Sequence, residues 1–475
     1  MYIQLICLLF LLVGCSTAQL PESSIRDPAT SDLMRTSLKL KKDGSRANKW
    51  ENTALIGNFI VNSQVLDNGL RILVVEDHSS PTFAYQTWFR VGSRDEDHGH
   101  TGLAHFFEHM MFKGTKSVKE GEFDRLLEQA GVVGENAFTS HDYTAYVQEL
   151  PKDKIELIMK LEADRMVNLI VDTKGFNTER EVVQNERRFR TENSPDGVIN
   201  EELFTLAFKR HPYHWPIIGY EKDLKGMTEK NAESFYQRFY SPNHATVIIV
   251  GDVNPSQILS LANQYYGSLS PQQAPSRFIV KEPPQMAPRR KVLRLNVQVE
   301  KLLIGYHIPN AKSFDMRALD VLQNILAGSK SSRLDQALVE AGIATTVEAG
   351  NFDNKDPSLF IIGANMQKNK KATQAENIIL REIKKLANTP VSKEELQTAK
   401  NKISFGFFEG LGSNYDKAAY LGHYEAVQGD FHAGLRHYEQ IQKVTAIQVR
   451  AVAAKYFTPR NRTVISGIQK GGKSR

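Results

Sequence analysis

The segment Gly102-Leu103-Ala104-His105-Phe106-Phe107-Glu108-His109-Met110-Met111-Phe112 decides how the rest of the chain is interpreted. In a helix, His105 and His109 stand four residues apart, so both imidazoles project from one face. Two neutral imidazoles at this spacing can bind one zinc ion. Glu108 is too close in sequence to His109 to be an easy third ligand, but it can reach a metal-bound water. The pattern His-x-x-Glu-His therefore predicts a zinc site that carries its own base.

An amphipathic helix with two exposed histidines is the plain alternative for this segment. The apolar residues around the motif argue against it, because a helix that is apolar nearly all round is buried. Two histidines and a glutamate in a buried helix need partners, since unpaired buried polar groups are costly. A metal ion satisfies all three groups at once, so metal binding is favoured.

The composition indicates a soluble globular protein of more than one domain. The chain has 475 residues, with 41% hydrophobic and 24% charged residues, and a chain of this length usually forms two or more domains. The net charge of +6 is spread along the sequence, and its short basic runs are interpreted as solvated surface. A nucleic-acid role would require a denser basic patch with interleaved aromatic residues, so we expect no nucleic-acid partner.

The N-terminus indicates export. Residues 1–14 carry no charged side chain and are too few to span a bilayer. They resemble the apolar core of a secretory signal peptide, and Leu12-Val13-Gly14-Cys15 resembles a bacterial lipobox. Lipoproteins of this type are cleaved before the cysteine, which is then lipidated. We therefore expect a membrane anchor only through lipid on Cys15; a plain secretory signal cleaved elsewhere is the alternative.

The two cysteines of the chain, Cys7 and Cys15, fit this interpretation. Cleavage would remove the first and lipidation would occupy the second, which leaves no thiol for a disulfide. Ser16 follows the cysteine, and in the bacterial sorting pattern that this resembles, the absence of aspartate there favours the outer membrane. The expected location is the bacterial cell envelope, with the protein lipid-anchored at the outer membrane and facing the periplasm.

Changes in composition along the chain predict its domain boundaries. Residues 15–55 are polar and lack periodicity, which is typical of a tether, and residues 271–290 form a proline-rich linker. We expect one domain at 56–270, a second at 291–467, and a basic tail at 468–475. Strands and helices are predicted without strict alternation, which favours the α+β class.

An internal repeat relates the two predicted domains. Residues 227–247 match residues 444–464 at one offset, so that Pro242 corresponds to Pro459, 217 residues later. Chance similarity of a helix–turn–strand unit is the alternative. At nearly the same offset, the helix predicted at 318–326 matches the motif helix. At the positions of His105, Glu108 and His109 it has Asp320, Gln323 and Asn324, respectively. The fold therefore does not itself require the motif, which points to chemistry.

A catalytic zinc ion needs a third protein ligand and one open position. Four candidates lie in polar segments near the motif, where exposed residues are expected: His98, His100, His141 and Asp142. Glu179 and Glu186 are better candidates, because they share one helix face with two valines. The alternative is that both pair with the neighbouring arginines, Arg187, Arg188 and Arg190. Spacing alone does not decide between these interpretations.

The chain resembles the pitrilysin-type inverzincin peptidases, and among them the half-length subfamily that includes the mitochondrial processing peptidase. The resemblance covers most of residues 60–467. It is strongest at 66–70, 91–96, 101–115, 136–140, 179–186 and 251–253. It implies two homologous α/β-sandwich domains that form half of a clamshell chamber, one Zn²⁺ per chain, and peptide substrates.

The resemblance also implies roles for individual residues. Glu186 would be the third zinc ligand beside His105 and His109, and Glu108 would be the catalytic base. Glu179 would support a histidine ligand from behind. An edge strand would pair with extended substrate, and its substrate-binding residues would be Asn136, Ala137, Phe138 and Thr139.

One family feature is missing from the second domain. The family uses an Arg and a Tyr there to bind substrate and to stabilise the transition state, but Val339 and Thr345 stand at those positions. In two-gene members of the family, one subunit has the zinc and the other has the Arg/Tyr pair. We therefore expect a zinc-dependent endopeptidase subunit that hydrolyses unfolded peptides as a heterodimer with a homologous non-zinc subunit.

Three alternatives to that interpretation stay open. A one-residue gap in the match leaves Arg333 as a substitute for the missing arginine. A non-catalytic binding or assembly subunit could keep the same fold. A purely structural zinc site is the third alternative, although such a site prefers four protein ligands and no adjacent base.

Overall fold

The computed structural model describes residues 50–56, 59–273 and 279–470. The predicted signal peptide, the lipidated Cys15 and nearly all of the predicted tether lie outside these residues. Within the described part of the chain, no helix is long and apolar enough to cross a membrane.

The first sheet has seven strands in the order β1-β2-β3-β7-β4-β6-β5. Strand β7 lies at its centre and is buried along its whole length, as its run of β-branched residues predicts. It pairs parallel with β3 and antiparallel with β4. The bounds are β1 Glu51–Ile56, β2 Phe59–Val65, β3 Arg71–Glu76, β4 Thr82–Phe89, β5 Val133–Thr139, β6 Thr144–Pro151 and β7 Ala245–Gly251.

The second sheet has five strands in the order β10-β11-β9-β12-β8. Its β12 pairs parallel with β8 and antiparallel with β9, which repeats the arrangement around β7 in the first sheet. The bounds are β8 Arg289–Leu295, β9 Lys301–Ile308, β10 Ala344–Asn351, β11 Ser358–Met366 and β12 Arg462–Gln469.

The two halves are homologous, and the predicted repeat is confirmed. Helix α7 leads into β7 as helix α14 leads into β12, at the offset of the sequence repeat. Both helices begin at a threonine, Thr228 or Thr445, whose side chain accepts a hydrogen bond from the backbone N–H three residues later. The predicted mixed α/β class with two homologous domains is therefore confirmed.

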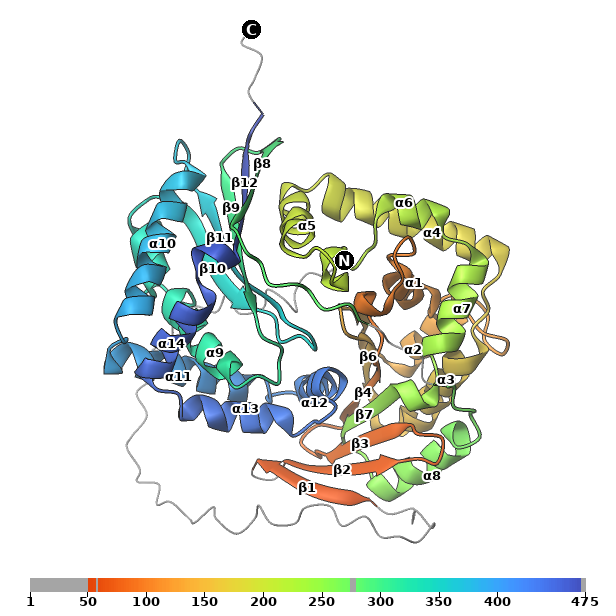
Figure 1. Ribbon diagram of the computed structural model, residues 1–475. Coiled ribbons are helices and arrows are strands. Elements are labelled where there is room, and N and C mark those ends of the chain that lie inside the picture. The colour runs from red at the N-terminus through yellow and green to blue at the C-terminus, as the bar shows by residue number, and fades with distance from the viewer. Residues whose placement is uncertain (1–49, 57–58, 274–278, 471–475) are drawn as a thin grey trace, which may run out of the picture. The chain divides into compact units, whose positions relative to one another are not determined.

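Helices flank both sheets (Figure 1). Those of the first half are α1 Leu103–Met110, α2 Glu122–Ala130, α3 Ile155–Asn168, α4 Thr173–Arg187, α5 Pro195–Ala207, α6 Glu221–Gly226, α7 Glu229–Phe239 and α8 Pro255–Tyr266. Those of the second are α9 Asp315–Leu326, α10 Ala372–Asn388, α11 Lys393–Glu409, α12 Asn414–Gln428, α13 Ala433–Gln442 and α14 Ala446–Tyr456. Two π-helical turns occur, at Arg188–Glu192 and Asp335–Glu340.

Each half contributes one helix that covers a face of the sheet in the other half (Figure 1). Helix α5 packs on β8, β9 and β12, where Leu203 and its neighbours form an apolar cluster with Leu359 and Ile465. Helix α12 packs on β4 and β7. Gly422 allows this approach, because a Cβ there would overlap the indole of Trp88. Both halves therefore depend on each other to bury their sheets.

Two predicted boundaries differ from the structure. Residues 51–55 belong to β1, which pairs with β2, and so they are not part of a tether. Strand β8 begins at Arg289, inside the predicted linker. Both segments form strands because they pair with a neighbouring strand, and composition alone does not reveal such pairing.

The sequence also predicted that Asp142 is exposed, but its side chain is buried, with 1% exposed. Tyr213 and the backbone N–H of Lys355 donate hydrogen bonds to its carboxylate, which satisfy it in the interior.

A candidate metal centre on helix α1

Helix α1 begins at a glycine that its surroundings require. Gly102 has φ 94°, in the left-handed region, and a Cβ there would lie 2.7 Å from the carbonyl oxygen of Ile218. The buried carboxylate of Glu96 accepts the N–H groups of Gly102 and Ala104, each at 2.8 Å. These bonds satisfy backbone donors that the first turn of a helix leaves free.

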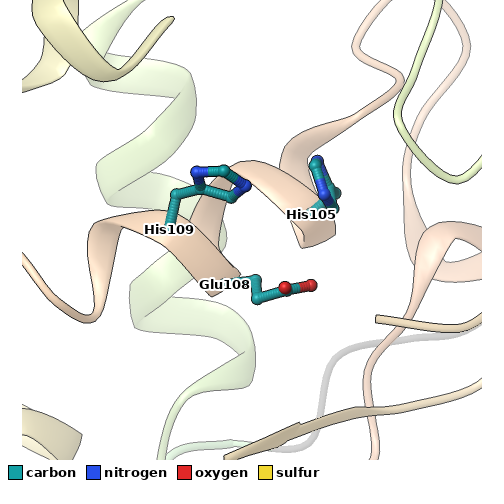
Figure 2. A group of neighbouring side chains, drawn as sticks. All are labelled: His105, Glu108 and His109. Carbon is teal, nitrogen blue, oxygen red and sulfur yellow. The ribbon is translucent and has the colours of Figure 1, made fainter. Parts of the chain in front are cut away.

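Figure 2 shows the side chains of His105, Glu108 and His109 projecting from α1. The apolar residues of the helix, Leu103, Ala104, Phe106, Phe107 and Met110, are buried. The predicted burial of this helix is confirmed, since His105 and Glu108 are 8% and 5% exposed. Candidate ligand atoms of His105, Glu108 and His109 all lie within 4.8 Å of one another. No other such cluster occurs among the described residues.

Helix α4 brings Glu186 to the two histidines. Its Oε2 lies 3.2 Å from Nε2 of His109 and 3.7 Å from Nε2 of His105. His98 and His100 do not join this group. His141 lies elsewhere, with its Nδ1 2.8 Å from Oγ of Ser93. The alternative predicted from the sequence, that Glu186 pairs with a neighbouring arginine, is also observed: Arg190 contacts the other carboxylate oxygen, Oε1, at 2.6 Å.

Glu179 lies behind His109. Its Oε1 is 2.7 Å from Nδ1 of His109, and its Oε2 is 2.8 Å from Nζ of Lys113. Burial works against the charged form of His109, but its hydrogen bonds to Glu179 and Glu186 raise its pKa to about 9. At pH 7 this imidazole therefore carries a proton on each nitrogen; a metal would displace the proton of Nε2, while Glu179 holds the one on Nδ1.

Glu108 contacts the edge strand. The hydroxyl of Thr139, at the end of β5, donates a hydrogen bond of 2.7 Å to Oε2 of Glu108. Burial raises the pKa of Glu108 above its ordinary value, and this hydrogen bond opposes that effect. Sequence reasoning placed Thr139 only among substrate-binding residues and missed this contact, because nothing in the sequence pairs residues 108 and 139.

The residues present fit a zinc ion. Among the described residues, Nδ1 of His105 is buried without a hydrogen-bond partner, and Oε2 of Glu186 faces the Nε2 atoms of both histidines, at 3.2 and 3.7 Å. Burial, and then the neighbouring His109, lower the pKa of His105 to about 3, so its imidazole is neutral at pH 7, as a ligand must be. Two imidazoles and one carboxylate beside a further glutamate form a donor set typical of catalytic zinc.

Strand β5 is the last strand of its sheet, so the predicted edge position is confirmed. Asn136, Ala137 and Phe138 pair with β6 on one side. A bulge shifts the register between Val133 and Asn136, and such bulges are common at sheet edges near active sites.

The second half fills the equivalent place with local hydrogen bonds. Asn351, at the end of β10, donates to Asp320 at 2.7 Å through its side chain and to Gln323 at 3.3 Å through its backbone. Asn324 donates to the carbonyl oxygen of Asp320. Helix and edge strand thus meet in both halves, and among the described residues the candidate metal-binding cluster lies in the first.

Arg333, the substitute considered for the missing arginine, contacts another residue of the second half. Its guanidinium forms two contacts with Glu395 on α11, at 2.7 and 3.0 Å. Thr345 donates to the carbonyl oxygen of Asn365.

Comparisons with known proteins identify the family. Residues 71–221 match the family described as "Insulinase (Peptidase family M16)", and residues 226–403 match "Peptidase M16 inactive domain". The zinc protease PqqE of Helicobacter pylori is 33% identical over 408 residues, which cover 85% of this chain and 91% of that protein. The chain belongs to peptidase family M16. The inactive-domain match includes the second-half helix that lacks the metal-binding side chains.

Other proteins are similar over comparable lengths of this chain. An uncharacterized zinc protease of Mycobacterium leprae is 28% identical over 417 residues, covering 85% of this chain and 90% of that protein. A crystal structure of a protease from Helicobacter pylori has TM-score 0.82 and 32% identity, and covers 86% of this chain and 99% of that one. The periplasmic protease PqqL of Escherichia coli has the same fold, with TM-score 0.70 and 18% identity. The match covers 89% of this chain and 48% of the PqqL chain.

Proposed function

We propose that this M16 chain is the zinc-bearing subunit of a metalloendopeptidase that hydrolyses unfolded peptides. The observation that carries the proposal is the convergence of His105, His109 and Glu186 from two helices, with Oε2 of Glu186 facing Nε2 of both histidines and Glu108 alongside. The names of the related zinc proteases support the metal and the reaction class.

The side chains divide the chemistry between them. His105, His109 and Glu186 would hold one Zn²⁺, which when bound activates a water and polarises the scissile carbonyl. Glu108 takes the proton of the water and passes it to the leaving amine. Thr139 orients the Glu108 carboxylate through its hydrogen bond. The raised pKa of Glu108 favours holding the proton between the two steps.

Strand β5 would align the substrate. An extended peptide can add to the free edge of β5 beside Asn136–Thr139 through backbone hydrogen bonds. Thr139 connects this edge to Glu108, so a peptide that extends the sheet passes next to the base. Folded substrates cannot supply such a strand, and a chamber closed by a second subunit would exclude them further.

The test is a metal analysis combined with a cleavage assay on unfolded peptides. We expect one zinc per chain, and cleavage that stops on chelation and returns with added zinc. The competing proposal, a non-catalytic binding or assembly subunit, is supported by the inactive-domain match in the second half. Peptide binding without cleavage, with zinc bound and with a homologous subunit present, would favour that alternative.

Glu179→Gln is expected to weaken zinc binding by about 10–100-fold, the usual cost of losing a carboxylate behind a ligating histidine. The reason is that Glu179 orients His109 through a 2.7 Å hydrogen bond. Competition with a chelator measures the dissociation constant. Glu181→Gln is the matched control, because Glu181 is exposed on the same helix. Equal zinc affinity in parent and Glu179→Gln would contradict the role of Glu179.

We also propose that the mature protein is anchored in the bacterial cell envelope by lipid on Cys15, facing the periplasm. One structural relative is described as a periplasmic protease. Cys15→Ser is expected to move the protein from the membrane fraction to the soluble fraction, or to stall its processing. A parent protein that is soluble in the periplasm and carries no lipid by mass spectrometry would refute the anchor.

A further inference from the structure

A π-helical turn follows the third candidate ligand directly. Helix α4 ends at Arg187, and the wider turn at Arg188–Glu192 closes with a hydrogen bond from the N–H of Asn193 to the carbonyl oxygen of Arg188. Such turns are rare and often occur at functional sites. Here the turn carries Arg190, which contacts Oε1 of Glu186 at 2.6 Å.

This contact holds one carboxylate oxygen of Glu186 and leaves the other for the histidines. Because Arg190 occupies Oε1, the other oxygen, Oε2, points between the imidazoles and lies 3.2 Å from Nε2 of His109. A carboxylate with one oxygen held by a guanidinium has little freedom to rotate. The position of the π-turn therefore sets the position of the ligand atom.

The first turn of α5 presses against the π-turn, and Gly197 makes the approach possible. A Cβ at Gly197 would overlap the carbonyl oxygen of Arg190 and would lie 2.7 Å from Cα of Thr191. Both of those atoms belong to the backbone, so no side-chain rotation could relieve the overlap.

Helix α5 itself has little room to retreat. Its opposite face is packed on the second sheet, where Ile199 and Leu203 are buried. On the ligand side, Arg187 ties α4 to α5 through two bonds to Glu201, at 2.9 and 3.1 Å. A side chain at position 197 would therefore displace the π-turn rather than α5.

We propose that Gly197 is a positioning residue for the third zinc ligand: it lets α5, docked on the second half, hold the π-turn so that Arg190 aims Glu186 at the two histidines. This inference rests on the proposed zinc-binding role of His105, His109 and Glu186. It goes beyond the ligands themselves, because it makes the packing of α5 on the second half part of what positions Glu186.

The first experiment measures zinc affinity by chelator competition and needs no cleavage assay. Gly197→Ala is expected to bind zinc about 10–100-fold more weakly than the parent, as for other losses of ligand support. Gly226→Ala is the matched control, because a Cβ there, in α6, would meet nothing within 4 Å. It should bind zinc as the parent does. Equal affinity of Gly197→Ala and the parent would overturn the inference.

A second pair of variants tests the route through Arg190. In the cobalt-substituted protein, Arg190→Met should alter the visible spectrum and Arg190→Lys should largely restore it. Arg188→Met is the control, since Arg188 lies in the same π-turn and contacts Asn185 and Glu221 instead. Gly197→Ala should have no further effect on zinc affinity in an Arg190→Met background, as expected for residues that act through one contact.

These measurements separate the two proposals. A parent protein that binds no zinc would refute the proposed function itself. A parent that binds zinc, with an Arg190→Met spectrum identical to its own, would refute only the positioning role. If Gly197→Ala fails to fold by circular dichroism, the Arg190 series decides the inference alone.

Discussion

Glu108→Gln is expected to lower the rate of peptide cleavage by about 10²–10⁴-fold while zinc binding persists, because the substitution removes proton transfer alone. Glutamine has nearly the shape of glutamate and can still accept the hydrogen bond from Thr139, so the packing around α1 should survive. The measurements are kcat on an unfolded peptide and zinc content of the same preparation. Measured together, kcat and zinc content distinguish a variant that has lost the base from one that has lost the metal.

Glu186→Gln is the matched comparison, since it makes the same chemical change on the neighbouring helix. It should lose zinc, and with it activity, because a neutral amide is a poorer ligand than a carboxylate. The two variants therefore fail for different reasons that metal analysis distinguishes. Cleavage by Glu108→Gln at the parental rate would refute the proposed mechanism.

The isolated chain is expected to bind zinc yet cleave peptides poorly, and a homologous subunit with an Arg/Tyr pair should raise the rate by about 10²–10³-fold or more. Loss of one group that stabilises the developing oxyanion typically costs that much. The resemblance places Val339 and Thr345 at the positions of that pair, and Arg333 contacts Glu395.

The measurement is a cleavage assay on the purified chain with and without the candidate partner, at equal zinc content. Arg333→Ala is the internal control, and it should leave the activity of the pair unchanged. Full activity of the chain alone, lost on Arg333→Ala, would show instead that the chain is self-sufficient and that Arg333 substitutes for the missing arginine.

The sequence by itself determined the features that depend on neighbours along the chain. The spacing of His105, Glu108 and His109 places them on one helix turn, and the apolar residues around them predict burial. The 217-residue offset predicts the duplication because both copies keep the same capped helix and the strand that follows it. These patterns are local or periodic, so they can be read without knowing how distant segments meet.

Only the tertiary structure decided which distant groups meet the motif. Spacing left Glu186 open between a ligand and an arginine partner; the fold gives one carboxylate oxygen to Arg190 and turns the other to the histidines. The contact of Thr139 with Glu108, the place of residues 51–55 in a sheet, and the closeness of Gly197 to the π-turn likewise depend on docking. The reason is physical. Such contacts are set by how whole elements pack against one another, above all α5 on the opposite sheet, and no local periodicity encodes that packing.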